Sequence, residues 1–91
     1  MYVARLVSIA RAEAIPEQFK GFVRFQSAIE GHDVEKGEKV AILVVEGTSC
    51  FVPVFLDRLR SLEELEGRLA AQQAQLSEDA RSAVSKHLSA R

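Results

Sequence analysis

The chain contains no tryptophan, one cysteine and two prolines among its 91 residues, and its apolar stretches are short. The single cysteine, Cys50, excludes an internal disulfide and a zinc site built from several thiolates. Its apolar neighbours predict a small buried side chain. A reactive thiol would need an exposed, electropositive setting, and none is evident in the sequence. No stretch reaches the roughly 18 apolar residues of a membrane span, and no secretory signal is visible. The cytoplasm is therefore the expected location.

The chain also lacks an excess of charge of either sign, since its formal net charge is −1. With a pI near 6.1, it has no general attraction for nucleic acid or for an anionic membrane. The charges are nevertheless uneven: residues 1–25 carry a balance of +2, residues 26–55 a balance of −3, and residues 56–91 none. Any anion-binding surface should therefore lie on the first of these segments.

What the chain does have is a central ribbon, residues 40–45, that is apolar on both of its faces. Successive side chains of a strand point to opposite faces. One set here is Val40, Ile42 and Val44, and the other is Ala41, Leu43 and Val45. Leaving three branched side chains in water forfeits roughly 1.5–3 kcal/mol each. Both faces of this strand therefore need an apolar cover.

Four segments are expected to form strands: residues 2–9, 19–29, 39–46 and 50–55. Gly21 suits a bulge or a sharp bend within the second of them. Pro53 has no amide hydrogen, which places the last strand at a sheet edge. The predicted fold class is α+β: residues 1–56 form a small OB- or SH3-like antiparallel β-barrel or a curved sheet of four or five strands. Residues 57–91 form a helical segment packed on it, within one domain.

The C-terminal segment carries helix signals. Ser61 and Glu64 have the spacing of a capping box, and Ser77 is a second cap. Two helices, over about 57–75 and 78–89, are favoured over one kinked helix. A leucine stripe on this segment is expected to form the interface with the sheet, in its own subunit or in a neighbour: Leu62, Leu65, Leu69 and Leu76. Because a core of this size is modest, a homodimer is favoured over a monomer.

Residues 21–53 contain "GFVRF", "SAIEGHDVEKGEKVAILVVEG" and "FVP". This run resembles the C-terminal domain of NfeD-type proteins, which implies an OB-like barrel and a protein-binding role with no catalytic residues. A second resemblance, to AbrB-type swapped-hairpin regulators, rests on "AIPEQFKG" and "EKGEKVAILVVEG". It implies a dimeric DNA-binding protein of the kind found among antitoxins.

One set of residues has the ingredients of a nucleic-acid site. Lys20, Phe22 and Arg24 alternate, so on a strand they would share one face, and Arg5 lies in the same basic segment. An aromatic ring between two cations can stack a base and hold phosphates. In the alternative interpretation, Phe22 packs under the C-terminal helix while the basic side chains reach solvent.

No constellation for catalysis, metal binding or a cofactor is visible. Ser49 and Cys50 lie in a turn without a suitably spaced histidine, and the histidines at 32 and 87 are far apart in the chain. The sequence therefore predicts a non-enzymatic protein-binding or scaffold module with a protein partner. The alternatives are a DNA- or RNA-binding regulator and a mobile-element protein that inhibits a host protein.

Overall fold

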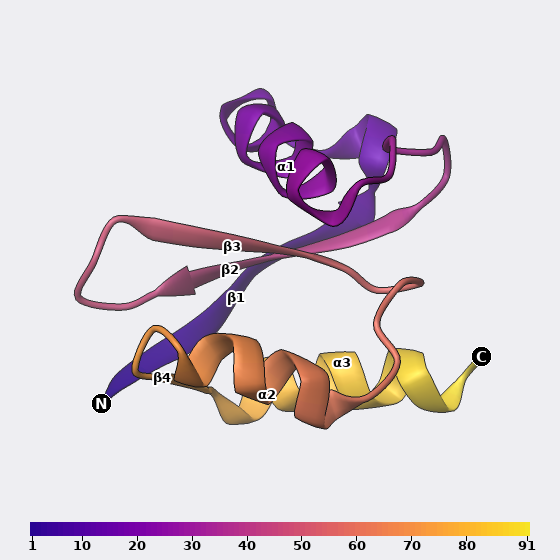
Figure 1. The fold of residues 1–91 in the computed structure, drawn as a ribbon. Helices are drawn as coiled ribbons and strands as arrows, with labels where there is room; N and C mark the ends of the chain where they lie inside the picture. The colour runs from indigo at the N-terminus through magenta and orange to yellow at the C-terminus, as the bar shows by residue number, and fades with distance from the viewer.

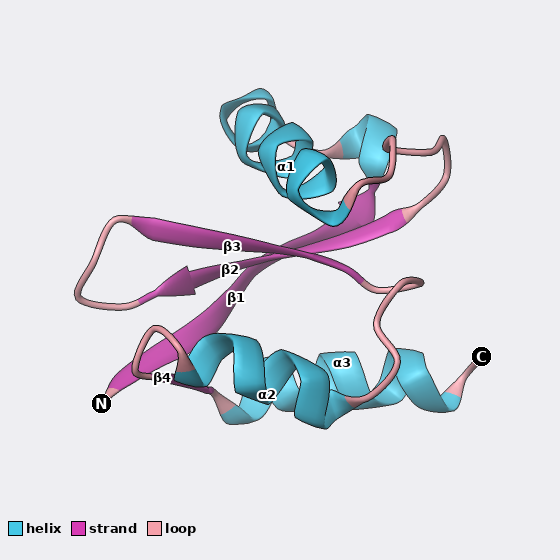
Figure 2. Cartoon of the chain, in the orientation of Figure 1, coloured by secondary structure: helices cyan, strands magenta, loops and turns pink.

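A computed structural model describes residues 1–91 as three layers, with a sheet between two layers of helix (Figures 1 and 2). Helix α1 lies on one face of the sheet, and helices α2 and α3 lie on the other. The strands are β1 (Tyr2–Arg11), β2 (Lys39–Val45), β3 (Cys50–Phe55) and β4 (Ala74–Leu76). The helices are a short 3-10 turn η1 (Ala12–Ala14), α1 (Glu17–Glu30), α2 (Leu62–Ala70) and α3 (Glu78–Ser89).

The four strands form one curled sheet in the order β3-β2-β1-β4. The pairs β1–β2 and β2–β3 are antiparallel, whereas β4 runs parallel to β1. The predicted α+β class is therefore confirmed, in its curved-sheet form with helices at the C-terminus. Strand β3 lies at the edge of the sheet, as Pro53 predicted.

The C-terminal helices cover the lower face of the central strand β2, which is the face turned toward α2 and α3 in Figure 1. The leucine stripe predicted this cover. Ala41, Leu43 and Val45 belong to one buried cluster with Leu65 and Leu69. Both leucines belong to the same chain as the sheet that they cover. The apolar cover that this face required is thus provided within one subunit.

The upper face is covered by α1, and here the prediction of a strand over residues 19–29 is wrong. Val40 and Ile42 form a second buried cluster with Ile15, Phe19 and Val23. The last two are four residues apart, the spacing that places side chains on one face of a helix. The same residues also fit a period of two, so that only packing against the sheet decided between the two readings.

The ends of α1 have local causes. Pro16 occupies the N-cap position with extended backbone, and a proline there loses no helical hydrogen bond. Gly31 ends the helix in the left-handed conformation, with φ at 76°, which glycine adopts without steric cost. Gly21, expected at a strand bulge, lies instead inside this helix.

The C-terminal segment matches the prediction at its caps and at α3. The Ser61 side chain accepts a hydrogen bond from the amide of Glu64, and Ser77 accepts one from Ala80. Helix α2 is shorter than expected, because the chain turns after Ala70 and pairs with β1 as strand β4. The segment expected to be wholly helical therefore also supplies a strand of the sheet. No helix of the chain has the length and apolarity needed to cross a membrane.

Candidate functional site

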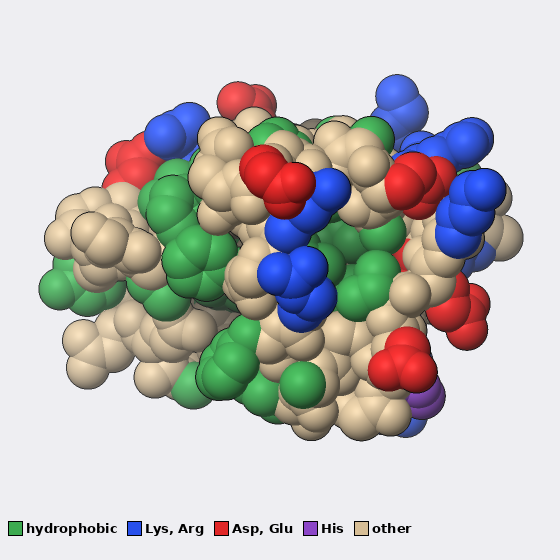
Figure 3. Space-filling model, turned by 90° about the horizontal axis from the view of Figure 1, so that it is seen from above, with side chains coloured by type: hydrophobic (Ala, Val, Ile, Leu, Met, Phe, Trp, Pro, Cys, Tyr) green, Lys and Arg blue, Asp and Glu red, His purple; other side chains and the backbone are tan.

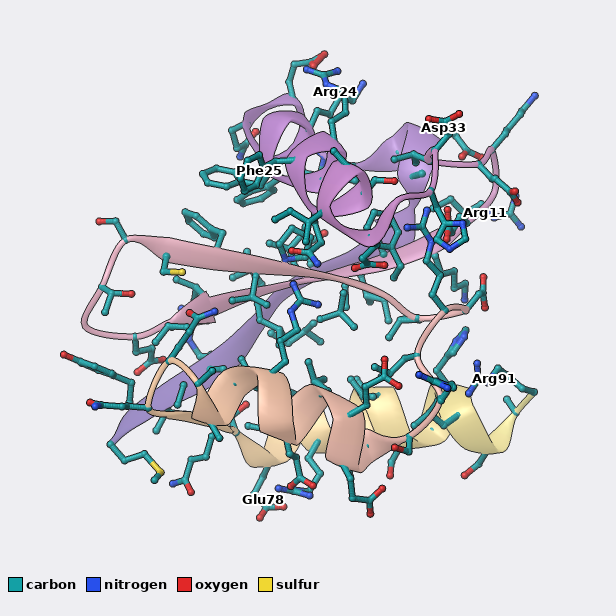
Figure 4. All side chains as sticks on the ribbon, in the orientation of Figure 1. Arg11, Arg24, Phe25, Asp33, Glu78 and Arg91 are labelled. Carbon is teal, nitrogen blue, oxygen red and sulfur yellow. The ribbon has the colours of Figure 1, made fainter.

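The structure does not bring the predicted nucleic-acid residues together. Because residues 20–24 are helical, Lys20 and Arg24 lie one turn apart on one side of α1, and Phe22 lies on a different side. Figure 4 shows Arg24 pointing away from the sheet, whereas Phe25 points toward the side of the β2–β3 hairpin. Arg5 lies on β1 and pairs with Glu46 across 2.5 Å. No π surface between two cations is formed.

Lys20 and Arg24 line a hollow of about 330 Å³ between α1 and the loop before β2, together with Lys36. Two carboxylates, those of Glu13 and Glu35, line the same hollow. Glu13 accepts a hydrogen bond from the backbone amide of Gly37 at 2.8 Å. That bond is the main cause that lowers the pKa of Glu13 below its usual value near 4.5. The hollow thus carries both signs of charge.

The predicted interface leucines lie largely inside the chain. Leu65, Leu69 and Leu76 are buried in the lower core, and Leu62 packs against it while partly exposed. Leu62, Leu65 and Leu69 lie on α2, whereas Leu76, predicted on the same helical stripe, lies on strand β4, so the four residues meet from both sides of the interface between helices and sheet. Three of the four are therefore not exposed for contact with another molecule.

The two most exposed apolar side chains of the helices and strands, Phe25 and Ile29, lie instead on the outer side of α1, together with Phe22. Phe22, Phe25 and Ile29 are 43%, 69% and 63% exposed. They are spaced at i, i+3 and i+7, which places them on one stripe of the helix. The signal was present in "FVRFQSAI", but it is visible only once the segment is read as a helix. The other exposed apolar side chains lie at the N-terminus and along β1.

The outer stripe of α1 borders a groove whose second wall is the edge strand β3. The groove has a volume of about 640 Å³, and hydrophobic side chains gather toward the left of the face shown in Figure 3. The ring of Phe51 on β3 contacts two rings of α1. Its centroid lies 5.1 Å from that of Phe19 and 5.5 Å from that of Phe22. These tilted aromatic pairs hold β3 against the helix. We call this surface the α1–β3 groove.

Arg68, on α2, is the only charged residue that lines the α1–β3 groove. Its Nη2 donates a hydrogen bond to the carbonyl oxygen of Pro53 at 2.9 Å. Burial lowers the pKa of Arg68, and the nearby charges of Glu30 and Glu64 oppose that effect. Those two carboxylates pair with Arg58 and Arg60 respectively. Arg68 is therefore a partly desolvated cation with no ion-pair partner of its own.

The free edge of β3 is poorly suited to pairing with a further strand. The amide of Leu56 donates a hydrogen bond to the carbonyl of Lys39. In an antiparallel pair, residues whose backbone groups bond to the neighbouring strand alternate with residues whose groups point outward, so the backbone groups of Pro53 point away from β2. Pro53 offers no amide hydrogen, and its outward carbonyl is already bonded to Arg68. The outward carbonyl of Phe55 accepts from the amide of Arg58. An added strand would find few backbone groups to pair with.

Cys50 lies at the rim of the groove and is exposed, so the prediction of a buried cysteine is wrong. It is the first residue of β3, next to the turn that joins β2 to β3, where the burial of the strand by apolar side chains ends. Its Sγ lies 3.3 Å from Oε1 of Gln72. Elsewhere, His87 pairs with Asp57 at 2.9 Å, and no three His, Cys, Asp or Glu residues are grouped so as to hold a metal ion.

The fold is that of a small α+β domain with a curled four-stranded sheet and an apolar groove on one side. Over residues 2–88 the sequence matches the family described as "Domain of unknown function (DUF749)", and the chain belongs to this family. It is similar to an uncharacterized protein of Methanocaldococcus jannaschii, with 25% identity over 88 residues. These cover 96% of this chain and 78% of the relative. No solved structure matches the chain.

These comparisons do not test the resemblances to NfeD-type barrels and AbrB-type regulators, which stay predictions. The strand led by Gly21, with which the NfeD-type resemblance began, is helical here. The family's description assigns no activity.

Proposed function

We propose that this protein is a non-enzymatic protein-binding module, and that it docks its partner through the α1–β3 groove. The observation that carries the proposal is the exposed stripe of Phe22, Phe25 and Ile29 beside a groove that holds one charged residue. Burying a fully exposed side chain of this size is worth roughly 1.5–3 kcal/mol, and a partner would gain the share of it that these residues still expose. Aromatic side chains that are buried on binding commonly dominate the affinity of an interface.

The rest of the chain supports this assignment, because its other large apolar groups are mostly used internally. The helices and the sheet bury two apolar clusters, and no buried side-chain polar atom lacks a hydrogen-bond partner. Apart from the contact of Phe22 with Phe51, an interior satisfied this fully gives no folding reason for an exposed stripe on α1. Contiguous exposed apolar surface of this kind is typical of interaction sites.

Partner recovery by matched variants tests the proposal. Phe25→Asp removes the centre of the stripe, and Arg24→Ser alters the neighbouring position, whose side chain points away from the sheet (Figure 4). We expect the wild type and Arg24→Ser to retain the same protein from extracts of the source organism, and Phe25→Asp to lose it. Retention of that protein by Phe25→Asp at wild-type level would exclude the groove as the docking surface.

A nucleic-acid-binding regulator is the competing function, and the same proteins test it. Lys20 and Arg24 would then bind phosphates, with affinity that falls steeply as salt rises. The carboxylates of Glu13 and Glu35 in the same hollow oppose this role. Binding of a DNA or RNA panel near 50 mM salt that Arg24→Ser weakens and Phe25→Asp does not would favour it over the groove. Inhibition of a host protein would use the same groove and stays a prediction.

A further inference from the structure

We propose that the α1–β3 groove takes an amphipathic α-helix of a different protein, and that a carboxylate of this helix pairs with Arg68. This inference rests on the proposed function, because it names the partner chemistry of the same surface. It is argued from the backbone of β3, the length of the stripe and the charge of the groove.

The backbone of β3 disfavours the main alternative, which is an extended peptide added to the sheet edge. Peptides that bind by strand addition gain affinity from main-chain hydrogen bonds. Here Pro53 has no donor, and its carbonyl is occupied by Arg68. We therefore expect an occupant to bind mainly through its side chains, which is how a helix binds in a groove.

The stripe has the dimensions of a helix contact. Phe22 and Ile29 are seven residues apart, so the stripe runs for two turns, or about 10 Å. A partner helix presents apolar side chains at i, i+3 or i+4, and i+7 over the same distance. Gly21 also lines the groove, and a Cβ at this position would meet no atom within 4 Å. The fold thus has no steric need for this glycine, and its missing side chain lets a partner backbone approach α1.

The charge of the groove specifies one further feature of the helix and argues against a second copy of this chain. Arg68 has no ion-pair partner, so an occupant that desolvates it further must supply a negative group. The carboxylates of α1 are those of Glu17 and Glu30, which already pair with Lys20 and Arg58. A symmetric pairing of two α1 helices would bring a second Arg68 and no free carboxylate. A partner helix with Asp or Glu beside its apolar stripe meets the requirement.

A display selection tests the inference. Two peptide libraries of equal size, one helix-stabilised and one proline-punctuated so that it stays extended, are selected on the immobilised full chain and counter-selected on Phe25→Asp. We expect the helical library to enrich, with apolar residues at i, i+3 or i+4, and i+7, and an acidic residue at one constant offset. Enrichment of extended peptides, or of helices without that acidic residue, would overturn it.

The role of Arg68 is measured on the best enriched peptide, with its acidic residue changed to the matching amide. By fluorescence anisotropy, we expect the amide peptide to bind at least tenfold more weakly to the wild type. Arg68→Met, which keeps an apolar stem, should bind both peptides equally. Equal binding of both peptides by the wild type would overturn the inference, whereas the proposed docking groove would stand.

Two further measurements separate the occupants. Binding of the peptide should slow alkylation of Cys50, the only cysteine, because Cys50 lines the groove. Light scattering at rising protein concentration reports self-association: a dimer that Phe25→Asp dissociates would assign the groove to a second copy and overturn the helix partner.

If no peptide of either library enriches over Phe25→Asp, the inference fails. The proposed function fails separately, when the retained protein does not depend on Phe25.

Discussion

Helices α1 and α2 cover opposite faces of one sheet and use their apolar side chains differently. Helix α2 turns its leucines inward, so that Leu65 and Leu69 are both 0% exposed. Helix α1 buries one stripe, through Phe19 and Val23, and carries a second stripe on its outer side. The inward leucines of α2 account for folding, whereas the outer residues of α1 stay exposed, and among them Phe22 alone pairs with an aromatic ring of the sheet, that of Phe51.

The two helices also differ in length and setting: α1 has 14 residues and covers its face alone, whereas α2 has 9 residues and shares its face with α3. A helix that only covers a sheet needs one apolar stripe. On a helix with two apolar stripes, the second stripe is left exposed to solvent.

Leu69→Ala should cause the largest loss of stability. Leu69 is fully buried in the lower core, and a leucine-to-alanine change in such a place lowers the free energy of unfolding by roughly 2–5 kcal/mol. Phe25→Ser, on the outer stripe of α1, should change it by less than about 0.5 kcal/mol. Urea denaturation measures the free energy of unfolding of both variants, and similar losses for the two would contradict the contrast between the helices.

Arg58→Met should destabilise the contact between the end of α1 and the chain that follows β3. The Arg58 side chain pairs with Glu38 at 2.7 Å and Glu30 at 3.2 Å, and its guanidinium lies 3.9 Å from the Phe55 ring centroid. Burial alone would lower the pKa of Arg58, but the hydrogen bonds to the two carboxylates raise it.

Removing the cation leaves Glu38 almost buried and unpaired, at a cost of about 3 kcal/mol. The double variant Arg58→Met/Glu38→Gln should recover part of this loss in urea denaturation, because it leaves no unpaired charge at Glu38. If the double variant is less stable than Arg58→Met, the ion pair is not the source of the effect.

Gly21→Ala separates folding from binding within α1. Because Gly21 is helical and nothing occupies the space beside it, alanine should raise the free energy of unfolding by about 0.5–1 kcal/mol. The same change should weaken binding of the selected helix. Thermal unfolding and anisotropy on one preparation test both expectations, and a variant that gains stability at unchanged affinity would remove Gly21 from the docking surface.

Glu13→Gln should have the smallest effect, and one that depends on pH. The amide of Gly37 lowers the pKa of Glu13 in the folded state, so ionised Glu13 favours folding above its unfolded pKa near 4.5. This contribution is lost as the pH falls through the lowered, folded-state pKa. The wild type should therefore have the higher Tm at pH 7, and the difference should shrink in acid. A difference that stays constant with pH would assign the effect to the hydrogen bond alone.

The sequence predicted the elements whose signals are local. The caps at Ser61 and Ser77, the edge position of β3 and the extent of α3 are confirmed, because each follows from residues a few positions apart. Residues 19–29 were predicted wrongly, since Phe19 and Val23 fit either period and no neighbouring signal separated the two. Strand β4 escaped prediction because its three residues pair with the distant β1.

The candidate site shows the same limit. Phe22 was named from the sequence, but with the wrong neighbours, since its place beside Phe25 and Ile29 depends on helical geometry. Arg68 was not named, because it reaches the groove from α2 through a contact with Pro53, fifteen residues away in the chain.

The order of residues in the chain was enough to require apolar layers on both sides of the central strand, because alternating side chains there are all apolar. Only the folded arrangement decided that α1 would provide the upper layer. The same arrangement left the outer stripe of α1 beside Pro53 and Arg68. A covering requirement is a property of a few consecutive residues, whereas a groove is a contact among three elements that lie far apart in the chain.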